Sequence, residues 1–141
     1  MGIATLPIPM NEAPLLCIVI EDEPLGQQVL ENYILRMNSL KLVAVCESVD
    51  EAFTVLKAQE VDVVFLDMQL KASWGTDLIS KLKQRSEHRY YIVITSATLA
   101  ESIDTKKIFI ENHVVLIDHL TKPIAFSSFE AAVNKILSSK T

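Results

Sequence analysis

Short apolar runs alternate along the chain with longer stretches in which apolar residues recur every three or four positions. The short runs are rich in β-branched residues and end in polar ones, a pattern typical of strands covered on both faces. We predict strands over Leu15–Ile20, Leu40–Cys46, Val61–Leu66, Tyr91–Ile94 and Val114–Leu120. The third of these is the clearest, because it reads Val-Asp-Val-Val-Phe-Leu and stops at an acid, Asp67.

The longer stretches predict amphipathic helices. Pro24 suits the first position of a helix, and the apolar stripe that follows contains Leu25, Val29, Leu30, Tyr33, Ile34 and Met37. Ser48 is a candidate cap for a second helix, with Glu51 at the capping-box position. The side of this second helix that we expect to be buried carries Ala52, Phe53, Val55 and Leu56.

Two further helices are predicted in the second half of the chain. Gly75 precedes one whose apolar residues are Leu78, Ile79 and Leu82. The last helix covers Phe126–Leu137 and directs inward Phe126, Phe129, Val133, Ile136 and Leu137.

The stretch from Thr98 to Leu120 has two interpretations. Leu99–Glu111 fits a helix with Asn112 as a left-handed cap, which makes Val114–Leu120 the fifth strand. Alternatively, Lys107–Ile110 and Val114–Ile117 form a hairpin around Asn112 and His113. We favour the helix, because strand and helix then alternate five times. That alternation predicts an α/β domain with a parallel sheet and helices on both faces.

Composition narrows the class of protein. The 141 residues suit one domain, which we place at 15–138 between a lead-in (1–14) and a short tail (139–141). The net charge of −5 argues against direct nucleic-acid binding, and the longest uncharged apolar run is too short to span a bilayer. Cys17 and Cys46 lie in apolar runs, so we expect reduced core thiols and a cytoplasmic protein.

Candidate chemistry follows the strands, because ligands of parallel sheets bind beyond the carboxyl ends. Glu21 and Asp22 follow the first strand, and Asp67 follows the third. With the strand order 2-1-3-4-5 the first and third strands are neighbours, so these acids would crowd together. Crowded carboxylates repel one another, and a divalent cation relieves the conflict; oxygen ligands of this kind favour Mg²⁺.

Polar residues after the other strands complete this picture. Thr95 and Ser96 follow the fourth strand, and Lys122 follows the fifth. An Asp beside a metal and a Lys is suited to accept a phosphoryl group, with a hydroxyl nearby to bind the phosphate. Each signal alone has an ordinary explanation, such as a helix cap, a turn or dipole-favoured charge. Their joint placement after four strands favours the chemical interpretation.

Five segments together resemble the receiver domain of two-component response regulators, the CheY-like superfamily. These segments are Cys17–Pro24, Val61–Asp67, Gly75, Ile92–Ala97 and Leu120–Ile124. The run Glu-Asp-Glu-Pro-Leu and the tail Lys-Pro-Ile-x-Phe-x-x-Phe are similar to the LytTR branch, whose receivers precede a DNA-binding domain. The resemblance implies a flavodoxin-like (βα)5 fold, with a doubly wound parallel sheet of five strands.

The resemblance also implies roles for individual residues. Asp67 would be the phosphoacceptor, and a sensor histidine kinase or phosphotransfer protein would be the donor. Mg²⁺ would bind the side chains of Asp22 and Asp67, the backbone carbonyl of Gln69 and, through water, Glu21. Lys122 would pair with the phosphate.

Further implications concern the switch. The switch hydroxyl would be Ser96, with Thr95 as the second choice, and the switch side chain would be His119. The domain would promote its own Mg²⁺-dependent phosphorylation and dephosphorylation without being an enzyme in the ordinary sense. A homodimer would use the fourth predicted helix, the fifth strand and the fifth helix.

Four features depart from the family pattern. Glu21 stands where Asp is commoner, Leu70-Lys71 replaces the usual Met-Pro, and the switch aromatic is His119. The stretch between Ser96 and Lys122 is also longer than expected. For His119 we favour an exposed, inert imidazole over a pH-sensitive switch.

Other functions fit less well. A phosphatase with an Asp nucleophile needs a second Asp two residues later, where this chain has Gln69. A flavin-binding protein needs glycines or hydroxyls after the first strand to hold a phosphate, not acids. A degenerate receiver that acts as an interaction scaffold without taking phosphate stays open as the alternative. The sequence leaves open whether the domain stands alone or precedes an effector domain.

Overall fold

The computed structural model describes residues 13–70, 75–84, 88–97 and 113–139. The strands form one parallel five-stranded sheet in the order β2-β1-β3-β4-β5, which confirms the predicted topology. Strands are β1 Leu15–Ile20, β2 Leu40–Cys46, β3 Val63–Asp67, β4 Tyr90–Ser96 and β5 Val114–Thr121. Helices are α1 Pro24–Leu35, α2 Val49–Ala58, α3 Gly75–Lys83 and α4 Phe126–Ser139.

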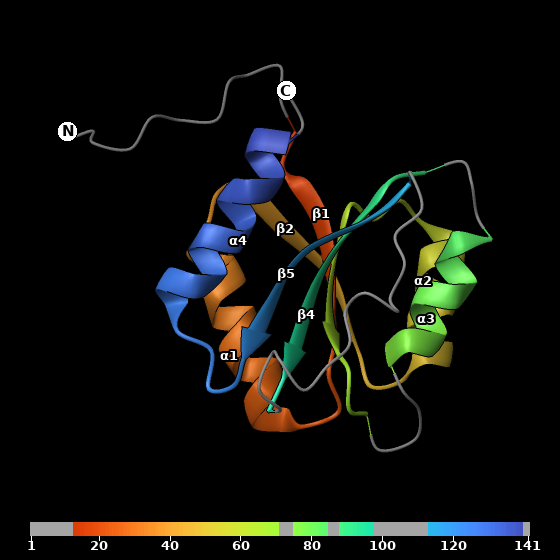
Figure 1. Ribbon diagram of the computed structural model, residues 1–141, viewed down its shortest axis with the longest axis horizontal. Coiled ribbons are helices and arrows are strands. Elements are labelled where there is room, and N and C mark those ends of the chain that lie inside the picture. The colour runs from red at the N-terminus through yellow and green to blue at the C-terminus, as the bar shows by residue number, and fades with distance from the viewer. Residues whose placement is uncertain (1–12, 71–74, 85–87, 98–112, 140–141) are drawn as a thin grey trace.

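Helices cover both faces of the sheet, and each face has its own core. Figure 1 shows α1 and α4 on one side of the strands and α2 and α3 on the other. Because side chains alternate along a strand, β3 directs Val63 and Phe65 to the α1–α4 core and Val64 and Leu66 to the α2–α3 core. The central strands are therefore buried on both faces, as their continuous apolar runs predict.

Three strands differ from their predicted bounds, β3 and β4 most of all. β3 begins at Val63, two residues later than predicted, although the backbone of Asp62 already hydrogen-bonds Leu16 and Tyr91. β4 runs on through Ser96, so the two polar residues expected after the strand lie within it. Asp67 pairs with Thr95 in the register, which brings the ends of β3 and β4 level.

The apolar stripe predicted for α1 is only partly buried, so this prediction is partly wrong. Leu30 and Ile34 are buried, whereas Leu25 is 78% exposed and Val29 37% exposed. At about 100° per residue, Leu25 lies roughly 140° around the helix from Leu30, so it cannot share the buried face. Leu137 of α4, predicted to point inward, is 36% exposed for a similar reason, since it follows the buried Ile136 directly.

The predicted cap of the second helix and the burial of both cysteines are confirmed. The Ser48 hydroxyl accepts a hydrogen bond from the Glu51 amide and caps α2. Cys17 and Cys46 are free and buried, and burial raises the pKa of Cys17 to about 12 and that of Cys46 to about 11. α3 begins at Gly75 itself instead of after it. None of the described helices is long and apolar enough to cross a membrane.

The fifth strand lies where the helix interpretation of the preceding stretch expects it. β5 pairs with β4 in parallel and ends one residue later than predicted. The choice between a helix over 99–111 and a hairpin strand over 107–110 falls outside the described residues, as does most of the lead-in.

Candidate functional site

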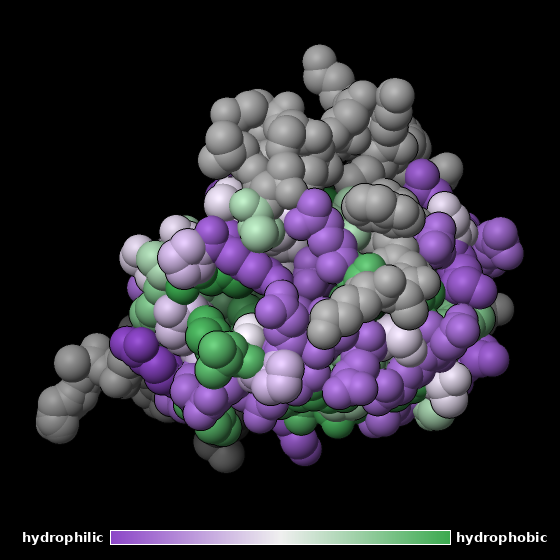
Figure 2. All heavy atoms as spheres, turned by 90° about the horizontal axis from the view of Figure 1, so that it is seen from below, coloured by the Kyte–Doolittle hydropathy of each residue, from purple (hydrophilic) through white to green (hydrophobic). Residues whose placement is uncertain are grey.

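The carboxyl ends of β1, β3 and β5 deliver charged side chains to one edge of the sheet. Glu21 directly follows β1, Asp67 is the last residue of β3, and Lys122 directly follows β5. The Lys122 amide donates a hydrogen bond to the Ser96 carbonyl, which fixes the Lys beside the end of β4. Figure 2 looks onto this edge, where hydrophilic side chains run across the middle of the face.

Three carboxylates meet at this edge, as predicted. Glu21, Asp22 and Asp67 each offer an oxygen atom, and these atoms all lie within 4.8 Å of one another. Glu21 and Asp67 are buried, and Asp22 is half-buried. Acids at such distances repel one another unless a cation or a proton balances them. Because their oxygens are hard ligands, the residues present fit Mg²⁺.

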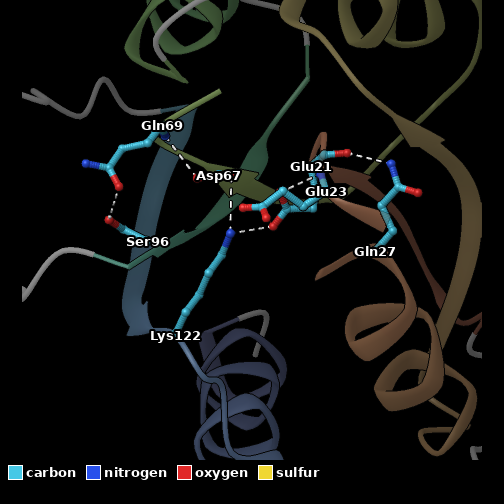
Figure 3. A network of polar contacts seen from close by, with 7 residues as sticks. All are labelled: Glu21, Glu23, Gln27, Asp67, Gln69, Ser96 and Lys122. Carbon is cyan, nitrogen blue, oxygen red and sulfur yellow. Dashed lines mark hydrogen bonds and ion pairs between the residues drawn. The ribbon is translucent and has the colours of Figure 1, made fainter. Parts of the chain in front are cut away.

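Lys122 bridges two of the carboxylates. Its ammonium Nζ lies 2.5 Å from Glu21 Oε1 and 3.2 Å from Asp67 Oδ2. Figure 3 shows the side chain reaching from the end of β5 to a point between the two acids. One cation therefore partly offsets the charge of two buried anions.

Backbone contacts hold the acids in place. The Glu23 amide donates to Glu21 Oε2 at 3.2 Å, and the Gln69 amide donates to Asp67 Oδ1 at 2.9 Å. Gln27, on the first turns of α1, donates from Nε2 to the Glu21 carbonyl at 2.7 Å (Figure 3). Sequence reasoning missed Gln27, because an amide on a helix gives no signal that it reaches back to the preceding loop.

For both Glu21 and Lys122, burial and ion pairing shift the pKa in opposite directions. Burial raises the pKa of the Glu21 carboxyl above its ordinary value; the hydrogen bond from Lys122 works against this rise and the neighbouring Asp67 adds to it. For Lys122, burial lowers the pKa of the ammonium, but the hydrogen bond to Glu21 and the charges of both acids outweigh burial and raise it. Lys122 therefore stays charged, and Glu21 takes a proton more readily than an ordinary glutamate does.

The two candidate hydroxyls occupy different surroundings. Ser96 Oγ donates a 3.4 Å hydrogen bond to Gln69 Oε1, two residues beyond Asp67 (Figure 3). Thr95 Oγ1 is buried without a hydrogen-bond partner among the described residues. Ser96 is thus the hydroxyl in contact with the loop after β3.

His119 lies on β5, opposite Ile94 of β4. Both imidazole nitrogens are buried and have no hydrogen-bond partner in the described part of the chain, so the interpretation of an exposed imidazole is wrong. Burial lowers the pKa of His119, although the charge of Asp118 opposes the shift. Asp118 itself pairs with Lys135 of α4 at 2.8 Å.

Comparison with known sequences gives a family match over most of the chain. The family model for the response regulator receiver domain matches residues 17–134. The Staphylococcus haemolyticus sensory transduction protein LytR is 27% identical over 84% of this chain and 44% of its own length. The Escherichia coli transcriptional regulatory protein BtsR is 29% identical over 84% of this chain and 46% of its own. The chain thus spans less than half the length of these relatives.

Solved structures share the fold. The response regulatory domain of mrkE from Klebsiella pneumoniae superposes with a TM-score of 0.74 at 22% identity, covering 89% of this chain and 97% of that one. A CheY-like receiver domain from Methylobacillus flagellatus gives 0.70 at 21% identity, covering 88% and 99%. With the family model matching most of its length, the chain belongs to the response regulator receiver domains of two-component systems.

Proposed function

We propose that this domain is a phosphorylation-dependent switch in which Asp67 accepts a phosphoryl group from the phosphohistidine of a sensor histidine kinase or a phosphotransfer protein. The observation that carries this proposal is the position of Asp67. It is buried at the end of β3, with Lys122 Nζ 3.2 Å from Oδ2 and two further carboxylates close by.

Asp67 would act as the nucleophile. A carboxylate oxygen attacks phosphorus, the P–N bond to the histidine breaks, and the imidazole nitrogen keeps the bonding electron pair. The Gln69 amide holds Oδ1 and Lys122 holds Oδ2, so the carboxylate keeps a fixed orientation. Fixed orientation lowers the entropy cost of reaching the transition state.

The side chains of Asp22 and Asp67 would hold Mg²⁺, with the Gln69 carbonyl as a further ligand and Glu21 acting through water. When bound, the ion supplies positive charge that offsets the charge on the transferring oxygens. Lys122 is already within reach of Asp67 and would pair with the new phosphate. Electrostatic stabilisation of this kind needs no rearrangement of the donors.

Ser96 is our choice for the switch hydroxyl, ahead of Thr95. Its Oγ already contacts the loop after Asp67, whereas Thr95 Oγ1 is enclosed without a partner among the described residues. Movement of Ser96 toward the phosphate would pull on the end of β4. His119, opposite Ile94 on β5, is placed to follow that movement, and the resulting change would alter the interaction surface around β5 and α4.

The partners follow from the relatives. Those named transcriptional regulators are about twice as long as the aligned segment, so any DNA contact would come from another part of such a protein. A homodimer would use the surface of β5 and α4.

The test is incubation with Mg²⁺ and acetyl phosphate, followed by intact-mass spectrometry. We expect one added phosphoryl group, absent in Asp67→Asn and without Mg²⁺. Asp118→Asn is the matched control, because Asp118, like Asp67, is a strand carboxylate paired with a Lys, yet it lies outside the acidic cluster. No adduct on the unaltered protein would contradict the proposal and favour the phosphate-independent scaffold.

A further inference from the structure

Gly26 lies in the first turn of α1, where the backbone conformation does not require glycine. Its φ is not positive, so a residue with a side chain could adopt the same backbone conformation. Glycine is also among the least favourable residues within a helix. The reason for glycine must therefore be the space that a side chain would occupy.

That space is filled by Glu21. A Cβ placed on Gly26 would lie 2.5 Å from Glu21 Oε1, 2.8 Å from Cδ and 3.1 Å from Cγ. Ordinary contacts between such atoms are roughly 3.5–4.0 Å. All three atoms belong to the far half of one side chain, so the conflict is with the length of Glu21 and not with the backbone.

Neither partner can easily move away. The Glu21 side chain is fully buried, with Oε1 held by Lys122 and Oε2 held by the Glu23 amide. Helix α1 is held too, because Gln27, the residue after Gly26, donates to the Glu21 carbonyl. A side chain at position 26 must therefore displace either the carboxylate from Lys122 or the helix from β1.

We infer that Gly26 is a positioning residue for the acidic site: its missing side chain makes the room in which the long acid Glu21 reaches Lys122. Gly26 and Glu21 form a size-matched pair. Gly26 allows this site to accept Glu, whereas the shorter Asp would not need the extra space. This inference rests on the proposed function in one respect: the carboxylate that Gly26 positions belongs to the proposed Mg²⁺ site.

The test is a double-mutant cycle with Gly26→Ala, Glu21→Asp and both together. Mg²⁺ affinity is measured by isothermal titration calorimetry, and the unfolding equilibrium constant by urea titration without metal. We expect Gly26→Ala alone to weaken Mg²⁺ binding and favour unfolding, each by about tenfold, the scale of coupling between residues in contact. In the Glu21→Asp background, which removes one methylene, the same substitution should have no such effect.

Equal effects of Gly26→Ala in both backgrounds would overturn the inference, as would no effect in the unaltered background. If Gly26→Ala does not fold, recovery of folding in the double variant supports the pair, and failure of both variants overturns it. Failure of the proposed function is distinguishable, because it would appear as no Mg²⁺ binding by the unaltered protein. The metal-free urea cycle still tests the pair in that case.

Discussion

At the scale of single residues, Glu21 and Lys122 show how the site accommodates buried charge. Glu21 is fully buried and its pKa is raised, while the Lys122 ammonium faces both Glu21 and Asp67. Burying a charge is costly unless it is paired and hydrogen-bonded. Here one ammonium group faces two carboxylates, so the negative charge of the metal-free site is not fully balanced.

This imbalance predicts a pH dependence of the metal-free protein. Because the pKa of Glu21 is raised on folding, the folded state binds more protons than the unfolded state between the ordinary carboxyl pKa of about 4.3 and the raised value. Stability should therefore increase as pH falls through this window and decrease as pH rises.

The measurement is the urea midpoint of metal-free protein from pH 7 to pH 5, compared with Glu21→Gln. The lowered pKa of His119 has the opposite sign and is common to both proteins, so the difference isolates Glu21. A pH-independent difference between the two proteins would contradict this prediction.

Lys122→Ala should destabilise the metal-free protein at pH 7 by about 3 kcal/mol, because it leaves two buried carboxylates without their cation. Lys135→Ala is the matched control. Its 2.8 Å pair with Asp118 is on the surface, with the Lys side chain 56% exposed, and such pairs contribute less than about 1 kcal/mol. Chemical denaturation of both variants compares them, and equal losses would argue that the buried pair has no special role.

At the scale of elements, aromatic packing ties α4 and the loop after β5 to α1. Phe129 stacks on Phe65 of β3 with ring centroids 5.0 Å apart, and its ring lies 5.5 Å from that of Tyr33. The Tyr33 hydroxyl donates to the Ile124 carbonyl at 2.7 Å, two residues after Lys122. The position of Lys122 therefore depends on how α1 and α4 pack together.

Phe129→Ala should cost about 3–5 kcal/mol of stability, because a fully buried ring leaves a cavity between β3, α1 and α4. Leu35→Ala removes an apolar side chain that is 81% exposed and should change stability by less than about 0.5 kcal/mol. Thermal and urea unfolding measure both. A small effect of Phe129→Ala would show that α4 is not part of the cooperative core.

At the scale of the whole molecule, the acidic site links ligand binding to folding. Two of the three carboxylates directly follow β1 and the third ends β3, and these segments meet only in the folded sheet. A ligand that binds only the folded state stabilises it by mass action, by about 2.7 kcal/mol at a hundred times its dissociation constant.

Mg²⁺ should therefore raise the melting temperature of the unaltered protein and should do so far less in Asp22→Asn. Asp50→Asn, which changes an exposed acid in the first turn of α2, should keep the full response. Calorimetric melting with and without Mg²⁺ tests this. An equal shift in all three proteins would indicate a general ionic effect and no specific site.

The sequence predicted the fold well where local pattern and burial agree. The β1, β2 and β5 runs, the Ser48 cap and the sheet order all follow from apolar runs, capping chemistry and alternation of elements. It failed for Leu25 and Val29, because an apolar residue on a helix does not reveal which face the sheet will cover. It also failed for the exposure of His119, whose surroundings come from neighbouring elements.

The sequence by itself determined which residue types stand at the ends of the strands, and hence that acids, hydroxyls and a lysine would share one edge. Only the tertiary structure decided that Lys122 bridges Glu21 and Asp67, that Ser96 reaches the Gln69 side chain, and that Glu21 fills the space beside Gly26. The physical reason is that strand order brings segments together, whereas side-chain length and helix packing determine which atoms touch.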